Sequence, residues 1–444
     1  MRKDTCFRSF REVLSQFLTP QVWKQAHQAW HPAHTPARWK LTPLVWVLLG
    51  MAWCCGNSLD ERFATARAVC VASNGKSRRP GGTLQGFLQA LERLPMPVLR
   101  ALARGVREGL GKQFVDGLRL GGWLPMACDG TRLECPRSKE LQQRLDTAGK
   151  PDAAPTVYLT AMVLLPLGLL WSWQWGKGTA SEHYHLRRLL PTLPERTLLV
   201  ADALYQGYEL FTAITQAGAG FLIRLSAKSY LYTLDDVCMK RFREGIVYYW
   251  PEQKARDKGL PPIKARALRV RGKKGDVWLL TSILDRAELS RKSAAQVYRW
   301  RWRNEGLFRQ YKRMLNKTKL QSHTLRLLHR EGEGALLALQ LLLAQAAQVV
   351  HHGKWGEVII ASPRGVLLRI RSVMNATLRL LGPRQWQTYQ RMLEQIRSAY
   401  RERTSSRTRQ VWPRRKDHKP PQPPTLRTMD DKLKTLLEQH LEAA

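Results

Sequence analysis

Apolar and polar residues follow three different patterns along the chain. Up to about residue 120, apolar residues recur at helical spacing, and Arg and Lys occupy the remaining faces. Ser58 before LDERFATARAV and Thr83 before LQGFLQALERL are typical helix N-caps. The apolar run from Leu44 to Cys55 is too short to cross a bilayer and predicts a buried helix. The first region is therefore predicted to be helical.

After about residue 120 the pattern changes to short apolar runs that end in acids. WLPMAC predicts a strand that ends at Asp129 and a turn, and RTLLVA predicts a strand that ends at Asp202. Between them, Pro166 and Gly168 divide the apolar stretch 157–175 into two halves, which predicts a β-hairpin. The segment SEHYHLRRLLPTLP predicts a helix that begins at Ser181. A strand, a hairpin, a helix and a strand indicate a mixed α/β domain.

The block from about residue 218 to 289 has no helical period. Four strand-like runs, FLIRLSA, EGIVYYW, IKARALRV and DVWLLTSIL, are separated by charged loops. The block is therefore predicted to be a β-rich insertion into the α/β domain. Helical spacing returns from Arg291, and GALLALQLLLAQAAQVV is so uniformly apolar that it must be buried.

Beyond Ser362 the chain is basic and helical, and then rich in helix breakers. The stretch RTSSRTRQVWPRRKDHKPPQPPT is predicted to be an extended or disordered linker. A last amphipathic helix is predicted to carry apolar residues on one side: Leu426, Met429, Leu433, Leu436, Leu437 and Leu441. Such a helix requires a partner surface, on this chain or on a second copy.

The charge balance indicates a polyanionic partner. The 73 Lys and Arg residues exceed the 35 Asp and Glu residues, which leaves a net charge of +38 and a pI near 10.6. Because the basic residues are spread along the chain and interleaved with aromatic ones, nucleic acid is favoured over a membrane surface. A solvated, highly charged surface is the alternative. The helical first region is accordingly either a small DNA-binding domain or a scaffold for the rest.

The cysteines and the N-terminal residues favour a reducing compartment. Seven cysteines at irregular positions form neither a disulfide framework nor paired zinc knuckles. The first residues, MRKDTCFRSFREVLSQF, lack the apolar region of a signal peptide. With 44% hydrophobic residues and no convincing membrane span, we expect a soluble cytoplasmic protein without a membrane partner.

Two acids follow predicted core strands. An ionised carboxylate beside a buried strand is costly unless it is paired or binds a cation, so Asp129 in MACDG and Asp202 in LVADA are candidate metal ligands. Alternatively, each begins a turn, where Asp is common. Their joint occurrence in one layout favours a metal site.

A third acid lies in the basic segment VYRWRWRNEGLFRQYKRML. On a helix with about 100° per residue, four of its residues fall at roughly 0°, −60°, −20° and −40°: Tyr298, Arg301, Glu305 and Lys312. One acid, two cations and a phenol on one narrow stripe do not suit an ordinary core face. The stripe would offer Glu305 to a metal while Arg301 and Lys312 grip phosphates.

The spacing Y-x(2)-R-x(3)-E-x(6)-K of these four residues resembles the YREK signature of insertion-sequence transposases of the DDE class, the IS-four-like group. Asp129 in MACDGTRL resembles the first acid of that family, and Asp202 in LVADALYQGYEL resembles the second. The similarity extends over about residues 124 to 350, with the β-rich insertion between the second and third acids, as in the family.

This resemblance implies an α/β fold in which an RNase H-like catalytic domain, a mixed sheet flanked by helices, is interrupted by a β-rich insertion. It implies that Asp129, Asp202 and Glu305 are catalytic and bind two Mg²⁺ ions, for which Mn²⁺ can substitute. Two such ions activate a water or a 3′-hydroxyl on one side of a phosphodiester and stabilise the leaving oxygen on the other.

The resemblance also implies that Tyr298, Arg301 and Lys312 bind DNA. The expected organisation has five parts: a helical DNA-binding region at 1–120, the first part of the catalytic domain at 121–217, the insertion at 218–289, the second part of the catalytic domain at 290–361, and a basic C-terminal region with a linker and an amphipathic helix at 362–444.

The expected function is transposition. The protein would cleave DNA at the inverted repeats of an insertion sequence and join the ends to target DNA, as a homodimer in the DNA complex and in association with the nucleoid. One alternative is a Mg²⁺-dependent endonuclease or resolvase that cuts without strand transfer. The other is a non-catalytic DNA-binding protein derived from a transposase.

Some weaker features have simpler readings. Trp250, and after it Trp278, are candidates for stacking on a flipped base, although a core Trp on a strand is simpler for each. His183 and His185 resemble a metal-binding pair without a third ligand and are expected at a helix cap or on the surface. Cys128 is expected to be a buried apolar residue.

Overall fold

The computed structural model describes residues 9–30, 38–56, 58–73, 79–147, 153–250, 258–272, 275–348, 350–352, 358–399 and 422–442. Six cysteines lie within these ranges, and all six are free thiols. No helix among the described residues is long and apolar enough to cross a membrane.

The first region is helical, as predicted. Its helices are α1 (Phe10–Ser15), α2 (Pro20–Gln28), α3 (Leu41–Trp53), α4 (Leu59–Ser73), α5 (Leu84–Arg93) and α6 (Met96–Phe114). The Ser58 and Thr83 hydroxyls cap α4 and α5 by accepting hydrogen bonds from the backbone N–H groups of Glu61 and Gly86. Almost every residue of α3 is buried, so the short apolar run is the buried helix that its length predicts.

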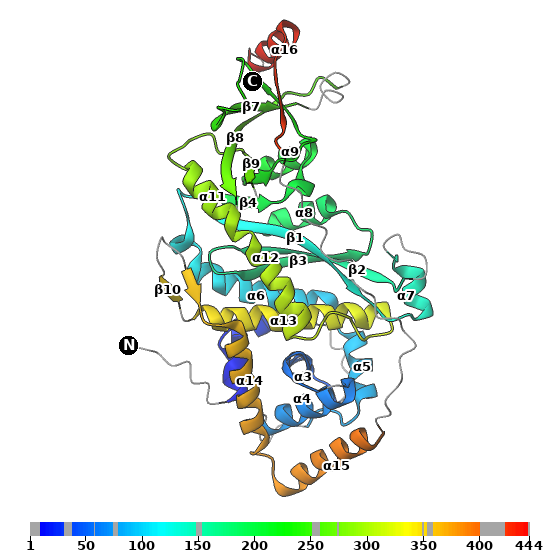
Figure 1. The fold of residues 1–444 in the computed structure, drawn as a ribbon. Helices are drawn as coiled ribbons and strands as arrows, with labels where there is room; N and C mark the ends of the chain where they lie inside the picture. Colours follow the sequence, from blue (N-terminus) through cyan, green and yellow to red (C-terminus); the bar gives the residue numbers. More distant parts are fainter. Residues whose placement is uncertain are drawn as a thin grey trace.

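The centre of the molecule is a ten-stranded mixed sheet with the order β12-β6-β7-β8-β9-β5-β4-β1-β2-β3 (Figure 1). Its strands are β1 (Leu124–Glu134), β2 (Thr156–Leu164), β3 (Leu169–Lys177), β4 (Thr197–Ala201), β5 (Gly220–Arg224), β6 (Tyr230–Thr233), β7 (Glu244–Tyr249), β8 (Ile263–Gly272), β9 (Gly275–Thr281) and β12 (Thr425–Thr428). The predicted hairpin is the antiparallel pair β2 and β3. β1 is antiparallel to β2 and parallel to β4, which is parallel to β5.

One predicted strand end is wrong. β1 does not stop at Asp129 but continues to Glu134, because its antiparallel pairing with β2 persists through Asp129, Gly130 and Thr131. Only the parallel pairing with β4 ends before the acid, at Ala127. The run of apolar residues in β1 ends where its pairing with β4 ends. Beyond that point β1 is paired only with β2 and becomes more polar, so the apolar pattern does not predict this part of the strand.

The strands of the 218–289 block extend the same sheet. β5 is parallel to β4, and β9 is antiparallel to β5, so the sheet continues without a break into β8, β7 and β6. Helix α8 (Glu182–Leu189) follows the hairpin and begins after Ser181, whose hydroxyl caps it. Helix α9 (Tyr208–Gln216) connects β4 to β5.

The motif segment is not one uninterrupted helix. It comprises α11 (Arg291–Trp300), α12 (Trp302–Arg309) and the π-helical turn η5 (Gln310–Met314). Between α11 and α12 the helix tightens, because the Arg301 N–H donates to the Tyr298 carbonyl at 3.2 Å and the Asn304 N–H donates to the Arg301 carbonyl at 3.0 Å. The π-helical turn η5 contains Lys312, whose side chain therefore departs from the 100° per residue of a regular α-helix.

Helix α13 (Leu325–Ala347) joins the helical region to the sheet. Its residues from Leu328 onward are buried almost without exception, as its uniformly apolar sequence predicts. It contacts β3 on one side and α3, α5 and α6 on others. In Figure 1 it crosses the molecule below the sheet and above α3 and α4.

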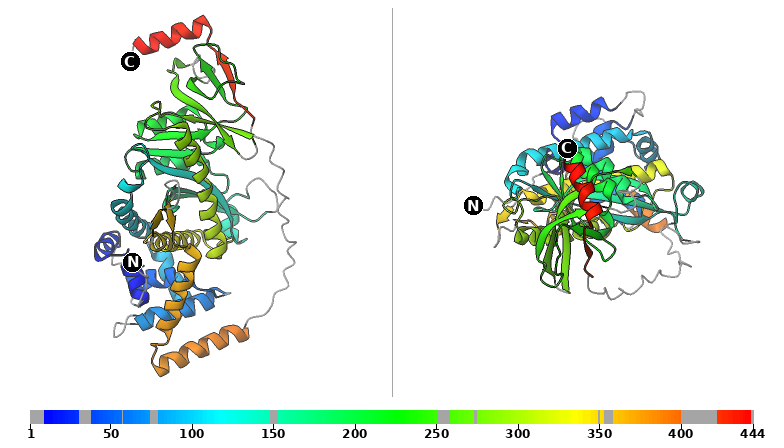
Figure 2. Two further views of the ribbon diagram at one scale, coloured as in Figure 1. Left: turned by 60° about the vertical axis from the view of Figure 1, so that its left-hand side comes forward. Right: turned by 90° about the horizontal axis from the view of Figure 1, so that it is seen from above.

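The C-terminal part of the chain reaches both ends of the molecule. α14 (Pro363–Leu378) and α15 (Pro383–Ala399) lie with the N-terminal helices, whereas β12 and α16 (Asp431–Glu442) lie at the far end of the sheet (Figures 1 and 2). The predicted linker lies almost wholly outside the described residues. The last amphipathic helix is present, but Leu426 belongs to β12, which pairs in parallel with β6. Met429 lies between β12 and α16, and Leu441 is exposed, so the predicted apolar side is correct for Leu433, Leu436 and Leu437 only.

The amphipathic helix finds its partner surface on this chain. Leu437 packs with Tyr232, Tyr248 and Trp250 in one cluster. Trp250 is 2% exposed and Trp278 4% exposed. Both candidate stacking residues are therefore core residues in this structure.

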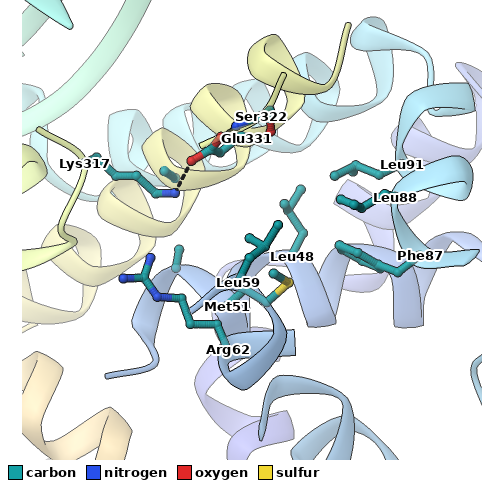
Figure 3. Close-up of a pocket in the computed structure, with 12 residues that line it drawn as sticks. Leu48, Met51, Leu59, Arg62, Phe87, Leu88, Leu91, Lys317, Ser322 and Glu331 are labelled. Carbon is teal, nitrogen blue, oxygen red and sulfur yellow. Dashed lines mark hydrogen bonds and ion pairs between the residues drawn. The ribbon is translucent and has the colours of Figure 1, made fainter. Parts of the chain in front are cut away.

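A buried ion pair lies between the helical region and the segment after η5. The Lys317 ammonium donates to the Glu331 carboxylate at 2.6 Å, and the N–H of Ser322 donates to the same carboxylate at 2.9 Å. Burial alone would raise the pKa of Glu331, but Lys317 and the backbone donors outweigh it and hold that pKa below its usual range. The pair faces an otherwise mainly apolar cavity lined also by Leu48, Met51, Leu59, Arg62, Phe87, Leu88 and Leu91 (Figure 3).

We predict that Glu331→Gln lowers the free energy of unfolding by about 3–5 kcal/mol, because Lys317 keeps a buried charge without its partner. Urea denaturation measures the loss. Glu134→Gln is the matched control, because Glu134 pairs with Lys319 at 3.0 Å but its side chain is 43% exposed. That change is expected to cost less than about 1 kcal/mol. Equal losses in the two variants would contradict the buried pair.

Candidate active site

The register of β1 and β4 brings the first two predicted acids side by side. Ala127 of β1 pairs with Val200 of β4, and this is the last residue pair between the two parallel strands. Asp129 and Asp202 each lie two residues further on, at the carboxyl ends of this pairing. Since neighbouring strands are about 4.8 Å apart, Asp129 and Asp202 lie in the same region of the sheet edge.

The Asp129 carboxylate is largely buried and crowded by like charge. One oxygen accepts the Gly130 N–H at 2.8 Å, and the other lies 3.9 Å from the Arg301 guanidinium. Burial raises the pKa of Asp129 to about 6; the Gly130 N–H and Arg301 act against this, and the charges of Asp202 and Glu182 add to it. An acid with this pKa needs a cationic partner to remain ionised at low cost.

Asp202 is held by the turn that follows β4. Its side chain accepts the Leu204 N–H at 2.8 Å and so caps the short helix η4 (Ala203–Tyr205). The turn reading of Asp202 made from the sequence therefore applies, and its reading as a metal ligand stays a prediction. The buried Tyr205 hydroxyl accepts a hydrogen bond from Cys128, which is 1% exposed, as expected for an apolar residue.

Helix α12 contacts β1 and β2. Two polar contacts link this segment to β1: the Arg301 guanidinium, just before α12, lies 3.9 Å from the Asp129 carboxylate, and Lys312, in the following turn, donates to the Thr131 hydroxyl at 2.7 Å. Glu305 lies between these two cations in the sequence, in the first turn of α12, and is exposed. The structure thus brings Arg301 and Lys312 to the strand of Asp129, whereas the meeting of Glu305 with Asp129 and Asp202 stays a prediction.

The other motif residues contact the protein itself. Tyr298 is 8% exposed, and the Arg301 guanidinium lies over its ring at 5.7 Å. Burial raises the pKa of Tyr298 and lowers that of Lys312. The predicted DNA-binding roles of Tyr298, Arg301 and Lys312 remain predictions.

Arg303 also links α12 to the rest of the domain, a role that the sequence did not predict. Its guanidinium donates to the carbonyls of Leu165 and Pro166 in the turn between β2 and β3, at 2.7 Å for Leu165, and it lies over the Trp300 ring. Arg303 thus ties the helix that carries Glu305 to the hairpin.

A fourth acid, Glu182, joins this region from the start of α8. Its charge acts on Asp129, Cys128 and Tyr205, so it lies near all three. The sequence shows it only as an acid in the first turn of a helix, where acids are common, so no pattern distinguishes it.

The two histidines beside Glu182 do not form a metal pair. His183 pairs with the Leu204 carbonyl at 2.7 Å, whereas His185 is 1% exposed and pairs with the Thr160 hydroxyl at 2.8 Å. The expectation of a cap or surface position is thus wrong for His185, which is a core residue with a satisfied ring nitrogen.

The donor set suits a hard divalent cation, because carboxylate oxygens are the ligands that Mg²⁺ and Mn²⁺ prefer. Among the described residues, however, no three His, Cys, Asp or Glu side chains stand close enough to hold a metal ion. The strand register brings Asp129 and Asp202 near each other, but the structure shows no closed set of three ligands among the described residues.

Comparisons with known proteins support one part of the sequence interpretation. Residues 125–341, just under half of the chain, match the family model described as "Transposase DDE domain". All three predicted acids and the four residues of the YREK spacing lie within this segment. This match supports the prediction of a DDE-type transposase domain in this segment, and it does not extend to the IS-four-like group.

No curated protein matches the chain. Among solved structures, the chain is similar to one described as "Cryo-EM structure of piggyBac transposase synaptic complex with hairpin DNA (SNHP)". The identity is 12%, the similarity covers 92% of this chain and 89% of that chain, and the TM-score is 0.43. A similarity of this strength decides neither fold nor function.

We predict that Asp129→Asn stabilises the protein. The pKa of Asp129 is about 6 in the folded state, against 3.8 for an ordinary Asp carboxyl group. The charge of Asp129 therefore does not lower the free energy of unfolding below about pH 4. The loss grows between pH 4 and pH 6 and is complete above about pH 6, at about 3 kcal/mol or less. Urea denaturation in a chelating buffer without DNA should show the gain at pH 8 and a smaller gain at pH 5.

Asp116→Asn is the control for this measurement, because the Asp116 side chain is fully exposed. Its unfolding midpoint should match that of the wild type at both pH values. An Asp129→Asn variant that is no more stable than the wild type at pH 8 would show that the carboxylate is well solvated.

Proposed function

We propose that this protein is a transposase that cleaves DNA at the ends of an insertion sequence and transfers the cut strands to target DNA. Asp129, Asp202 and Glu305 are its catalytic acids. The observation that carries the proposal is the matched position of Asp129 and Asp202, each two residues beyond the last parallel pair of β1 and β4. The family match over 125–341 supports the same reading.

The catalytic core has an RNase H-like architecture in this proposal. An antiparallel run, β3-β2-β1, continues into two parallel strands, β4 and β5, and the acids leave the two central strands at one edge. Strands β6 to β9 then form the insertion between the second acid and α11, and β5, which opens the 218–289 block, belongs to the core sheet through its parallel pairing with β4. The boundaries proposed from the sequence are 121–217 and 290–361 for the catalytic parts, 218–289 for the insertion, and 1–120 and 362–444 for the flanking regions.

The three acids would hold two divalent metal ions, Mg²⁺ or in its place Mn²⁺. When bound, these ions supply the charge that activates a water or 3′-hydroxyl and stabilises the leaving oxygen of a phosphodiester. The chain's own residues fix the geometry: the Gly130 N–H orients Asp129, the Leu204 N–H orients Asp202, and Arg303 holds α12 on the hairpin. Arg301 keeps positive charge beside Asp129.

Double-stranded DNA is the proposed partner, both as inverted repeats and as target. The net charge of +38 supplies the sequence-independent attraction. On binding a phosphate, Tyr298, Arg301 and Lys312 would exchange their internal contacts for DNA contacts. Because both ends of an element must be held together, we propose a homodimer in the DNA complex, acting at the nucleoid.

We predict that Asp129→Asn and Glu305→Gln each lower cleavage by about a hundredfold or more, because each removes a ligand of ions that supply several kcal/mol of transition-state stabilisation. The assay incubates the full chain and Mg²⁺ with labelled DNA that carries the element's own inverted repeats. Cleaved ends and joined molecules are separated on denaturing gels.

Glu209→Gln is the matched control, because Glu209 is exposed on α9 and pairs with Arg187 on the surface. It should cleave and join like the wild type. Cleaved ends without joined products would indicate an endonuclease or resolvase. Equal products from the wild type and Glu305→Gln would exclude Glu305 as a catalytic acid.

A further inference from the structure

Helices α14 and α15 are joined by a short turn at the end of the molecule opposite β12 and α16. The turn consists of the four residues 379–382 and ends in Gly382. In Figure 1, α15 lies across the lower end of the molecule and runs at a large angle to α14. Two helices that meet at a large angle through a turn of this length are the layout of DNA-binding helix-turn-helix motifs, in which the second helix enters the major groove. The outward face of α15 decides whether this layout has that role.

The helical region supports this helix pair from one side. The buried residues of α14, among them Leu367, Ile370 and Met374, face the body of the protein, where α14 contacts α1, α3, α4 and α13. Helix α15 contacts α4, and the Tyr389 hydroxyl lies 3.2 Å from the Thr65 hydroxyl. The opposite face of α15 is therefore left to solvent.

The solvent face of α15 carries side chains that suit base recognition. Arg384, Gln387, Thr388 and Arg391 are all exposed, and their offsets of 0, 3, 4 and 7 place them on one side of the helix. The Thr388 hydroxyl donates to the Arg384 carbonyl at 2.8 Å. Within the described part of the chain, the side chains of Arg384, Gln387 and Arg391 have no hydrogen bond or ion pair. Arg binds guanine edges and Gln binds adenine edges in the major groove.

The charges of the helix pair do not serve the helices themselves. From Ser362 to Leu393 the chain contains several arginines and neither Asp nor Glu. Arg364 and Arg384 lie in the first turns of α14 and α15, where the helix dipole favours acids and disfavours cations. A solvated helix surface would normally mix both signs of charge. A face of arginines without acids suits the phosphates of a nucleic acid.

We propose that α14 and α15 are a DNA-binding helix-turn-helix, in which α15 enters the major groove of double-stranded DNA and reads its sequence through Arg384, Gln387 and Arg391. This goes beyond the proposed function, which places DNA contacts only beside the catalytic acids. A second copy is a poorer occupant, because a twofold contact would set the same arginines against each other. A membrane surface is poorer as well, because these exposed positions are polar.

The test selects duplexes from a pool with a randomised centre, using the full chain in a chelating buffer so that no DNA is cut. The wild type and Glu305→Gln should enrich the same sequences, because Glu305 lies outside α15. Gln387→Ala should bind the enriched duplex about tenfold more weakly than the wild type and bind the unselected pool equally well, because a neutral Gln contributes a base contact and no charge.

Lys432→Ala is the matched control for Arg391→Ala, because Lys432 is exposed on α16 and each change removes one positive charge. Arg391→Ala should lose the preference for the enriched duplex, whereas Lys432→Ala should keep it. Circular dichroism checks that each variant is folded.

Three outcomes would overturn the inference: a wild type that enriches no sequence, α15 variants that bind the enriched duplex like the wild type, or α15 variants that lose only dimerisation in light scattering. Sequence selection without any DNA cleavage in Mg²⁺ would instead refute the proposed function and leave this inference standing.

Discussion

The parallel pairing of β1 with β4 is the constraint on which the candidate site depends. Both strands are buried where they pair, so their register is strongly specified, and a slip of one residue would turn Asp129 away from Asp202. The parallel pairing stops at Ala127 and Val200, so Asp129 keeps a strand partner only on β2, and Asp202 lies just past the end of β4. The raised pKa of Asp129 follows from this position, because the carboxylate is desolvated by the strands and faces other acids.

Polar contacts between distant segments then place α12 on β1 and the hairpin. Arg301 lies beside Asp129, Lys312 donates to Thr131, and Arg303 donates to the hairpin carbonyls. From the sequence, the first two cations are expected to bind phosphates. In the structure their partners are a carboxylate and a hydroxyl of β1, so in the proposed DNA complex a phosphate would have to replace these partners.

Local signals in the sequence predict most of the elements, whereas non-local pairing escapes them. Ser58, Thr83 and Ser181 begin helices as predicted, because a cap depends on three or four neighbouring residues. The continuation of β1 past Asp129 and the addition of β12 to β6 depend on segments far away in the chain. Of the candidate site, acids at the ends of predicted core strands indicated Asp129 and Asp202, and the YREK spacing indicated Glu305; their catalytic roles stay predictions. Neither pattern predicted the contacts of Arg303, whose partners lie on the hairpin.

Helix α13 makes the helical region and the sheet depend on each other. A helix that is apolar on nearly all sides is stable only when every side is covered. Here β3 covers one side, and α3, α5 and α6 cover others. The Lys317 to Glu331 pair ties the segment after η5 to the same helix. The N-terminal region is therefore part of the folded body, so any DNA that it binds must lie against faces of its helices that α13 leaves uncovered.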